Sequence, residues 1–440
     1  MYISRLEIKN LRSIAQAEIE LNAPGANGIA LPNVNVLLGG NGSGKTTVLR
    51  AAALAVLAPT LMQSSGYVPD RMIRVVAGQS PKVWPAATVR AKVALDAQDR
   101  ADLAPAGAAK LADDALLLDA HIETLGDSER LIFAARKELT SRIEYVQFDA
   151  SSTAFFMVGY GATRRVEAST RVDESARIKA RARRYERVSS LFEDHIGLMP
   201  LSYWLPDYGR RNPGRHNQVI RLLNELLPDN CQIQAKPTET NAGTEHLFEM
   251  NGTALPFRAL SDGFRAFVGW VGDMLFHICM GAQRGGKLRE VSGVALVDEI
   301  DLHLHPEWQR VVLPNLAKAL PAMQFIVTTH SPLVVASLAS ANLFVLATET
   351  DSKGASASAV RRLPDPVTGR SAEQLLLSPY FGLSSTRSVQ AEQRLGDLAA
   401  ATAKGDPAAS IAYLKLLAGG LAPDTSEPRS PKAGRAKVTK

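Results

Sequence analysis

The chain has 440 residues, of which 46% are hydrophobic, and its formal net charge is +6. This length is enough for a large core or for two to three units, and the hydrophobic share is ordinary for a globular protein. No apolar run approaches the ~18–20 residues that cross a bilayer, the first residues are typical of a strand rather than a signal peptide, and two cysteines form no metal or disulfide framework. We therefore expect a cytoplasmic protein without a membrane partner, whose charge permits a polyanionic partner without demanding one.

Near the N-terminus, residues 33–50 read "NVNVLLGGNGSGKTTVLR", an apolar strand followed by a glycine-rich loop and a helix. Gly39, Gly44, Lys45 and Thr46 have the spacing of the phosphate-binding loop G-x-x-x-x-G-K-[ST]. Glycines let successive N–H groups surround phosphates, while the lysine is a charge for the β and γ phosphates and the threonine hydroxyl is a Mg²⁺ ligand. The sequence thus predicts binding of a nucleoside triphosphate with Mg²⁺ through Gly39, Asn41, Gly42, Gly44, Lys45, Thr46 and Thr47.

The middle of the chain alternates between strand and helix patterns. Residues 85–150 show a period of two, as in "TVRAKVALD" and "SRIEYVQFD", which is typical of antiparallel strands. Residues 171–227 are predicted to be mainly helical, with an interruption by the loop "PDYGRRNPGRHN". No heptad pattern survives for three heptads, so the sequence predicts no long coiled-coil arm.

The stretch 164–187, "RRVEASTRVDESARIKARARRYER", carries nine Arg or Lys against four Asp or Glu. Such a face could neutralise the phosphates of duplex DNA, and the candidate contacts are Arg181, Arg183 and Arg184. A solvated helix face is the alternative. The lack of interleaved aromatic residues argues against stacking on a single strand.

A second acidic half-site follows in "GVALVDEIDLHLHP". Asp298 and Glu299 stand at the tip of a short apolar strand, where the first is placed to hold Mg²⁺ and the second to polarise a water molecule. Taken alone, the pair could be a solvated acidic turn. Together with Thr46 in the phosphate-binding loop, Asp298 is predicted to be the other protein ligand of the metal.

Two further motifs flank this acidic pair. "LSDGFRAFVGW" opens a helix with Ser261, Asp262 and Gly263, and "QFIVTTHSP" is a buried strand that ends in His330. Taken singly, the first is typical of a helix cap and the histidine of a core residue. The order of phosphate-binding loop, S-D-G, D-E and histidine favours a functional interpretation of all four.

This set resembles the ABC-type ATPase heads of the SMC, RecF and OLD families, and in particular the compact bacterial AAA-family ATPases of anti-phage systems such as Septu. The resemblance lies in "LEIKNLRSI", "GGNGSGKTT", "GYGATRRV", "ALSDGFRAF", "DEIDLHLHPEWQ" and "TTHSP". It implies an α/β P-loop NTPase of the ABC/SMC-head type, with a mixed central sheet, a flanking antiparallel sheet and a helical insertion. The expected segments are an N-terminal lobe 1–163, an insertion 164–255, a C-terminal lobe 256–421 and a disordered basic tail 422–440.

In such heads two protomers pack head to tail around two nucleotides, so the resemblance implies a homodimer or higher oligomer. It further implies that Ser261, Asp262 and Gly263 bind the γ-phosphate held by the partner. Glu299 would be the catalytic base, and His330 would sense the γ-phosphate.

The resemblance also implies a nucleotide contact for Arg12 in "NLRS" and a Q-loop glutamine. Gln147 in "EYVQFDA" is the candidate, although it precedes the strand "FFMVGYGA" where the glutamine is expected. His303 and His305 have a spacing that zinc could use, but the family carries "LHP" as a structural feature. Trp308 is interpreted as a packing residue.

After His330 the sequence offers Glu349 and Asp351 behind an apolar strand, as a TOPRIM nuclease would. No D-x-D motif follows, and "SASAVRRLPD" is typical of the return strand of a hairpin. We therefore expect ATP hydrolysis without DNA cleavage, and a separate effector protein, a nuclease, that docks on the insertion or on residues 371–418.

These observations favour an ATPase that dimerises on ATP and regulates that effector in bacterial anti-phage defence. One alternative is a RecF-like ATPase of DNA repair, which the absence of an arm leaves open. Another is a non-hydrolysing scaffold that senses ATP, and Glu299 argues against it.

Overall fold

The computed structural model describes residues 1–64, 69–76, 78, 84–103, 115–133, 143, 146–147, 152–166, 183–194, 196–240, 243–281, 286–350 and 356–417. Met1–Phe381 forms one compact unit and Gly382–Lys440 forms a second. In the described part of the second unit, α14 (Val389–Ala403) and α15 (Pro407–Leu417) pack against each other as a helical hairpin.

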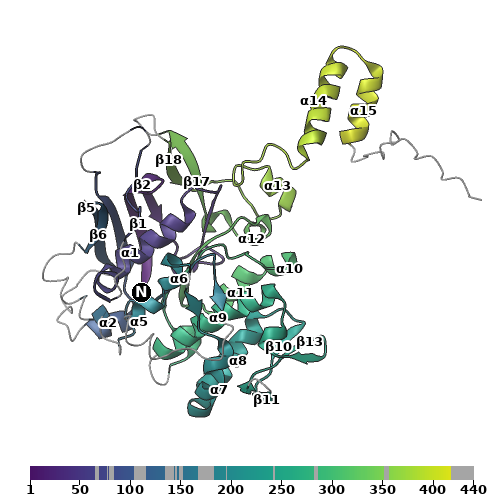
Figure 1. Ribbon diagram of the computed structural model, residues 1–440. Coiled ribbons are helices and arrows are strands. Elements are labelled where there is room, and N and C mark those ends of the chain that lie inside the picture. Colours follow the sequence, from purple (N-terminus) through teal and green to yellow (C-terminus); the bar gives the residue numbers. More distant parts are fainter. Residues whose placement is uncertain are drawn as a thin grey trace, which may run out of the picture. The chain divides into compact units, whose positions relative to one another are not determined.

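A six-stranded mixed sheet forms the centre of the first unit (Figure 1). Its five parallel strands are joined at one edge by a single antiparallel strand. A strand from near the N-terminus, β3, lies between two strands from the last third of the chain. The order across the sheet is β18 (Ser356–Arg361), β17 (Leu343–Thr350), β3 (Val34–Gly39), β16 (Met323–Thr328), β15 (Gly293–Val297) and β7 (Met157–Tyr160).

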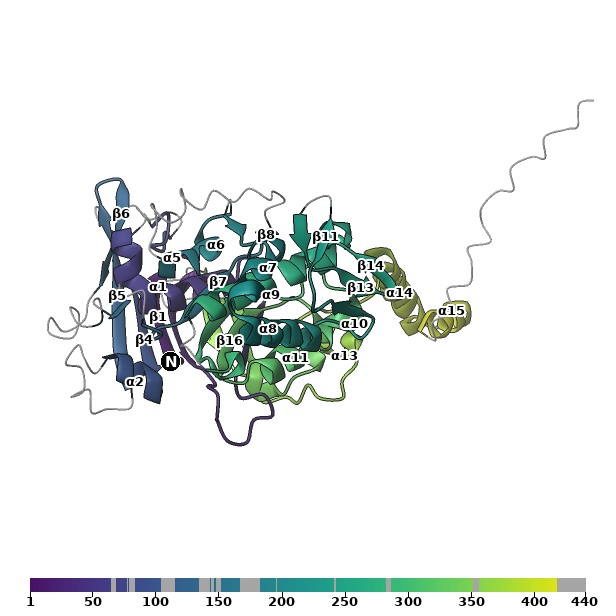
Figure 2. The same ribbon diagram turned by 90° about the horizontal axis from the view of Figure 1, so that it is seen from below.

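The central strands are apolar on both faces because both faces are covered, as is usual for parallel strands. In β3, Val36 and Leu38 belong to one core cluster, whereas Leu37 between them belongs to the other. The second cluster contains α1 (Lys45–Ser64), which lies between the central sheet and a flanking sheet (Figure 2). A helix enclosed in this way is apolar on all sides.

The expectation that no apolar run approaches the length of a membrane span needs a correction at α1. Within the described residues, the helical segment Lys45–Met62 is long and apolar enough to cross a membrane, and 83% of this segment is buried inside the protein. The helix is therefore a core element, and its apolar character follows from its place between two sheets.

The flanking antiparallel sheet is confirmed. Its order is β2 (Ile14–Glu20), β1 (Tyr2–Leu11), β4 (Ala87–Ala94), β5 (Ala115–Leu125) and β6 (Ser128–Phe133), and α2 (Ala97–Leu103) follows β4. The expected strand "SRIEYVQFD" is wrong where the structure describes it, because Ile143, Val146 and Gln147 are helical.

The opposite face of the central sheet is covered mainly by helices, chiefly α7 (Leu201–Arg211), α8 (Pro213–Leu226), α9 (Asp262–Gly281) and α11 (Val312–Ala319). Shorter elements complete this unit. They are the helices α5 (Arg183–Glu186), α6 (Ser189–Phe192), α10 (Pro306–Gln309), α12 (Pro332–Ala336) and α13 (Ala372–Leu376), the 3-10 turns Phe257–Ala259, Leu288–Glu290 and Ser340–Asn342, and the strands β8 (Arg165–Val166), β9 (Gly197–Leu198), β10 (Cys231–Ile233), β11 (Thr238–Thr240), β12 (Gly243–Glu245), β13 (Phe248–Met250) and β14 (Thr253–Leu255).

The insertion differs from its expected form in two respects. The predicted loop at 206–217 is helical except at Asn212, because Pro213 occupies the first turn of α8, where a missing N–H costs nothing. The segment after α8 carries the short strands β10–β14 rather than helix.

Candidate active site

The carboxyl ends of four neighbouring parallel strands meet at one edge of the central sheet, the usual position of ligand sites in such sheets. The phosphate-binding loop follows β3, and His330 follows β16. Asp298 and Glu299 follow β15, and Arg164 lies shortly after β7. The structure therefore brings the main site residues from distant parts of the sequence together.

The phosphate-binding loop depends on glycine at two positions. Gly39 has a φ of 151° and Gly44 a φ of 94°. A Cβ atom at Gly39 would lie 2.6 Å from the Leu346 carbonyl oxygen, and one at Gly44 would lie 2.7 Å from Ser13 Oγ. The loop leads directly into α1, whose N-terminus aims free N–H groups and a positive dipole at the loop, as in anion sites.

Lys45, the first residue of α1, is buried. Its ammonium donates to the carbonyl oxygens of Gly39 at 2.8 Å and Gly40 at 3.0 Å. Burial lowers the pKa of Lys45, while the nearby charges of Asp298 and Glu299 oppose this effect. A cation is thus held inside the loop, where phosphate oxygens could replace the two carbonyls.

Thr46 and Asp298 fit a magnesium site. The Thr46 hydroxyl donates to Asp298 Oδ2 at 2.6 Å, and Thr328 Oγ1 donates to Asp298 Oδ1 at 2.6 Å. A hydroxyl and a carboxylate are hard oxygen ligands, which Mg²⁺ prefers alongside substrate phosphates and water. Bound there, Mg²⁺ would neutralise charge on the phosphates.

Glu299 has an unusual backbone that is fixed on both sides. Its φ is 49°, in the left-handed region that non-glycine residues rarely adopt. Its N–H donates to Thr328 Oγ1 at 2.7 Å, and its carbonyl oxygen accepts from Arg164 Nη2 at 2.6 Å. Thr328 therefore orients both acidic residues, Asp298 through its side chain and Glu299 through its backbone.

The S-D-G motif opens α9, and Ser261 and Asp262 are exposed there. Gly263 packs against the segment that follows the acidic pair, since a Cβ atom at Gly263 would lie only 2.3 Å from the His303 carbonyl oxygen. The exposed polar residues are therefore anchored by a close backbone approach just behind them.

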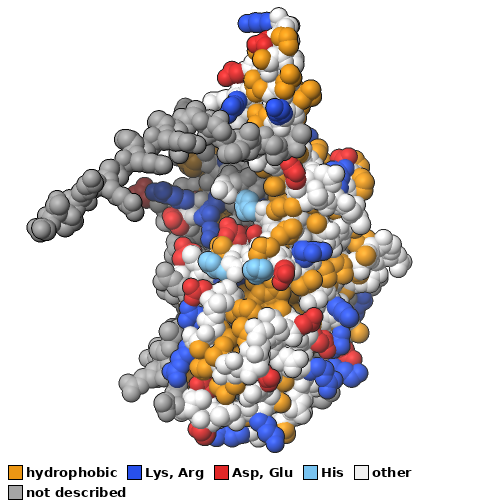
Figure 3. Space-filling model, turned by 90° about the vertical axis from the view of Figure 1, so that its right-hand side faces the viewer, with side chains coloured by type: hydrophobic (Ala, Val, Ile, Leu, Met, Phe, Trp, Pro, Cys, Tyr) orange, Lys and Arg blue, Asp and Glu red, His pale blue; other side chains and the backbone are white. Residues whose placement is uncertain are grey.

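His330 is exposed, between the end of β16 and α12. The residues around it are fixed: Thr329 Oγ1 donates to Asp301 Oδ1 at 2.5 Å, and Ser331 caps α12. One face of the molecule shows histidines and acidic side chains close to a continuous apolar area (Figure 3).

Arg12 lies in the turn between β1 and β2, and its guanidinium donates to the Asp70 carbonyl oxygen at 3.4 Å. The adjacent Ser13 hydroxyl lies against Gly44. The turn is thus next to the phosphate-binding loop, and contact between Arg12 and a nucleotide stays a prediction.

The interpretation of Gln147 as a Q-loop glutamine was wrong. Its buried side chain donates to the Val56 carbonyl oxygen at 2.7 Å and lies 3.5 Å from Thr60 Oγ1. Val56 is about three turns into α1, about 16 Å from its start. Gln147 therefore supports the middle of the core helix instead of facing the phosphates.

Arg184 was also misinterpreted as a DNA contact. It is buried, and its guanidinium donates to the carbonyl oxygens of Ala154, of Val146 at 3.1 Å and of Ser152 at 3.2 Å. A guanidinium with buried acceptors on several sides cannot face a phosphate. Arg181 lies outside the described residues, and so does the side chain of Arg183.

Three other sequence interpretations concern residues near or after the acidic pair. Trp308 is buried against Phe264 and Phe267, which confirms its packing role. No group of three or more metal-ligating side chains occurs among the residues that the structure describes. β17 and β18 form the predicted hairpin, in which Glu349 pairs with Arg361 at 2.6 Å; Asp351 lies outside the described residues.

Arg164 entered the sequence interpretation only as one cation of the basic stretch 164–187 and as part of the motif "GYGATRRV", with no role of its own at the site. The residue lies beside the acidic pair and donates to the backbone of Glu299. One signal in the sequence could have identified this site residue. It is an arginine that comes shortly after an apolar strand and next to glycines that permit a tight turn.

The phosphate-binding loop after β3, the acidic pair after β15 and the six-stranded mixed sheet define a P-loop NTPase. The family described as "AAA domain, putative AbiEii toxin, Type IV TA system" matches residues 82–336, and the "AAA ATPase domain" family matches residues 1–59. The chain belongs to the first of these families and is an ATPase-type protein.

Two curated relatives illustrate the similarity. The "Retron Ec83 probable ATPase" of Escherichia coli is 31% identical over 37% of this chain and 29% of its own length. The "Septu protein PtuA" of Bacillus mycoides is 28% identical over 52% of this chain and 30% of its own length. The chain thus spans less than a third of these relatives.

Among solved structures, the SMC head domain from Thermotoga maritima has a TM-score of 0.44 at 15% identity and covers 83% of this chain and 100% of its own. The Smc head domain from Pyrococcus furiosus, bound to the C-terminal domain of ScpA, has a TM-score of 0.47 at 16% identity and covers 82% and 96%. The strand order and the family match, rather than these scores, carry the fold class.

Proposed function

We propose that this protein binds and hydrolyses ATP with Mg²⁺ at sites shared between two head-to-tail copies, and that it regulates a separate effector in bacterial anti-phage defence. The observation that carries the hydrolysis is the grouping of three parts at one sheet edge. Lys45 lies in a glycine-rich loop, Thr46 contacts Asp298 at 2.6 Å, and Glu299 follows on the same strand end.

In the proposed reaction, the loop and Lys45 hold the phosphates and Thr46 with Asp298 would hold the metal. Glu299 accepts a proton from water as the water oxygen attacks the γ-phosphorus. The bond from this phosphorus to the bridging oxygen breaks, which leaves ADP and phosphate. A carboxylate on a backbone fixed at both its N–H and its carbonyl suits this role, because its direction is set before the substrate arrives.

The shared site is supported by exposure at the start of α9. Ser261 and Asp262 are exposed on a helix of 20 residues, and His330 is exposed at the sheet edge. The N-terminus of such a helix suits a γ-phosphate bound by the other copy. Two copies related by a twofold axis would form two equivalent sites.

The effector and the defence role are inferred from similarity to the Septu and retron proteins named above. The pairing of Glu349 with Arg361 in a hairpin favours a structural role for that glutamate, so we place DNA cleavage on a separate nuclease. The protein would act in the bacterial cytoplasm. Co-purification of the full chain from its host, followed by mass spectrometry, tests this: an effector nuclease supports it, and replication proteins would favour a RecF-like role.

The ATPase itself is tested with two substitutions that should fail differently. Glu299→Gln should bind ATP normally and hydrolyse it at least roughly a hundredfold more slowly, because only water activation is lost. Lys45→Ala should instead weaken ATP binding itself. Steady-state phosphate release and titration with a fluorescent ATP analogue measure both. Wild-type turnover in Glu299→Gln would disprove the assignment.

A further inference from the structure

Arg164 is a half-buried cation whose guanidinium has an incomplete set of partners. It lies shortly after β7, and its Nη2 donates to the Glu299 carbonyl oxygen at 2.6 Å. Its Nη1 is buried and has no hydrogen-bond partner among the described residues. Most buried polar groups are paired, so an open donor beside an acidic cluster calls for a functional explanation.

The charge of Arg164 is retained despite its burial. Burial lowers its pKa to about 10, and the carboxylates of Asp298, Asp301 and Glu299 oppose that shift. The guanidinium also lies over the Trp270 ring, 5.8 Å from its centroid. A guanidinium is weakly hydrated and stacks on aromatic rings, which makes arginine better suited than lysine to this position.

Arg164 forms a hydrogen bond with a residue, Glu299, whose backbone has an unfavourable conformation. A non-glycine residue in the left-handed region is strained and persists only where its surroundings hold it there, and Glu299 has a φ of 49°. Three hydrogen bonds hold the backbone of Glu299. Its N–H donates to Thr328, and its carbonyl oxygen accepts from Arg164 at 2.6 Å and from the Leu302 N–H of the same turn at 3.0 Å. Thr328 lies within β16 of the central sheet, whereas Arg164 reaches Glu299 from the loop after β7.

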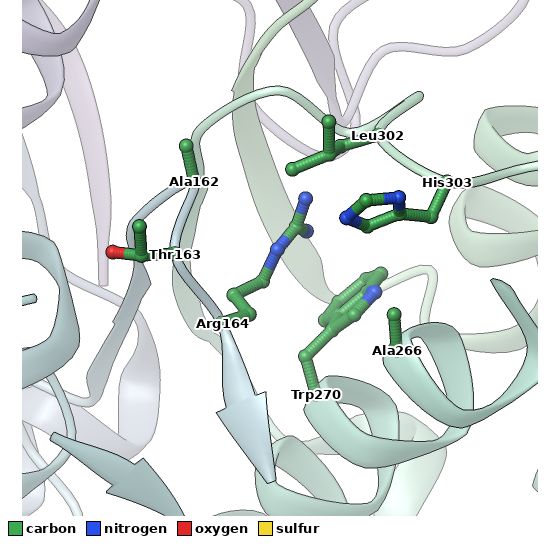
Figure 4. A pocket seen from close by; sticks show the side chains of 7 residues that line it. All are labelled: Ala162, Thr163, Arg164, Ala266, Trp270, Leu302 and His303. Carbon is green, nitrogen blue, oxygen red and sulfur yellow. The ribbon is translucent and has the colours of Figure 1, made fainter. Parts of the chain in front are cut away.

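This support also involves the helix that carries the S-D-G motif. Trp270, under the Arg164 guanidinium, belongs to α9, and Gly263 at the start of α9 packs on the His303 carbonyl. Figure 4 shows Arg164 between Trp270, Leu302 and His303. These side chains and their neighbours line a cavity of about 270 Å³.

We infer that Arg164 is a positioning residue that fixes the Glu299 carboxylate for attack of water on ATP, and that ties this geometry to α9 through Trp270. The inference rests on the proposed function. Arg164 itself touches neither water nor phosphate in this role, and it works through the Glu299 backbone. It should therefore affect turnover and not the affinity for ATP.

The test is Arg164→Ala in the full chain, together with the ATP affinity of the same variant. We expect kcat to fall on the order of ten- to a hundredfold, as when other orienting hydrogen bonds are removed, while the Kd of a fluorescent ATP analogue stays within about twofold. The removed side chain should enlarge the adjoining cavity. Guanidinium chloride at low millimolar concentration should then restore part of kcat, whereas sodium chloride at equal ionic strength should not.

Two further variants keep the outcome decisive. Adding Arg164→Ala to Glu299→Gln should give no further loss, because two residues that act through one step are not additive. Arg164→Lys keeps a cation over Trp270, so it can test the positioning role of Arg164 even if the alanine variant does not fold. It should fold and lose kcat at unchanged Kd.

Three results would overturn the inference. They are wild-type kcat in Arg164→Lys or Arg164→Ala, a loss of ATP affinity that accounts for the whole effect, and a full additional loss in the double variant. Turnover of Glu299→Gln at the wild-type rate would instead refute the proposed ATPase.

Discussion

His277 on α9 is a buried residue whose ionisation should make stability depend on pH. Its side chain is 10% exposed and lies 3.4 Å from Asp273, which also accepts from Tyr160 at 2.8 Å and from the Met199 N–H at 2.8 Å. Burial lowers the pKa of His277 to about 4, with Asp273 opposing and Arg187 adding to the shift. The native state therefore keeps this imidazole neutral where the unfolded chain would protonate it.

The direction in which the free energy of unfolding changes with pH follows from proton uptake by the unfolded chain. Between about pH 6.5 and about pH 4 the unfolded chain binds a proton at His277 that the native protein does not, so the free energy of unfolding falls as pH decreases through this window. The loss is at most about 1.4 kcal/mol per pH unit. His277→Gln removes this effect, so its melting temperature should fall less over the window than that of the wild type. Parallel thermal melts measure it, and identical pH profiles would contradict it.

At individual residues, the sequence predicted the parts of the site whose chemistry is encoded locally. Gly39, Gly44 and Lys45 follow a spacing that only a phosphate-binding loop requires, and the structure gives both glycines a positive φ. Gln147 and Arg184 were misread because a glutamine or arginine on a strand or helix looks the same whether it faces solvent, a ligand or a buried carbonyl. Their partners, Val56 and Ala154, are set by packing between distant segments.

Among the elements, the burial of Arg184 changes how DNA binding should be tested. Replacing Arg184 would leave several buried carbonyl oxygens without a hydrogen-bond donor, and each unsatisfied oxygen would cost about 1–3 kcal/mol of stability. A loss of DNA affinity in that variant would then reflect a destabilised fold and not a lost contact with a phosphate. Arg181 and Arg183 are the remaining candidates.

The double substitution Arg181→Glu and Arg183→Glu, with Arg184 kept, should weaken binding of duplex DNA. It should also flatten the salt dependence of log K by about 1 for each phosphate that the protein no longer neutralises, because fewer counterions are released. Titrations at several salt concentrations measure this. Arg184→Ala is the control, and it should lower the melting temperature and leave the salt slope unchanged. An unaltered slope in the double variant would indicate a solvated face.

The elements themselves were predicted best where an uninterrupted apolar run marks a strand that is buried on both faces. The buried strands at 34–39, 293–297 and 323–328 each read as short apolar runs, and each is a central strand. The segment at 206–217 was misread because Pro and Gly suggested a loop. Trp204 and Leu205 are buried in α7, and Pro213 starts α8, so packing and a favourable first turn outweigh the weak local preference.

For the whole molecule, dimerisation should require both ATP and the start of α9. In the Glu299→Gln background, ATP with Mg²⁺ should produce a dimer, and adding Ser261→Arg should abolish it. The larger cation would occupy the space where the γ-phosphate of the other copy docks, and Ser261 is exposed, so the substitution should not disturb the core. Light scattering with and without ATP measures the mass. A dimer that ignores both ATP and the substitution would refute the shared site.

The order of strands in the central sheet also has a consequence for the chain during its synthesis. β3 pairs on both sides with late segments: Val34 with Phe325, and Val36 with Leu343. At roughly 5–20 residues per second, a ribosome needs on the order of tens of seconds between making β3 and making its neighbours. Throughout this interval the apolar strand has no partners and is a target for chaperones, and Asp298 and Glu299 have yet to be made for most of it. An unfinished chain can therefore carry the phosphate-binding loop without its acidic partners, so the proposed ATP hydrolysis is expected only once the sheet has closed.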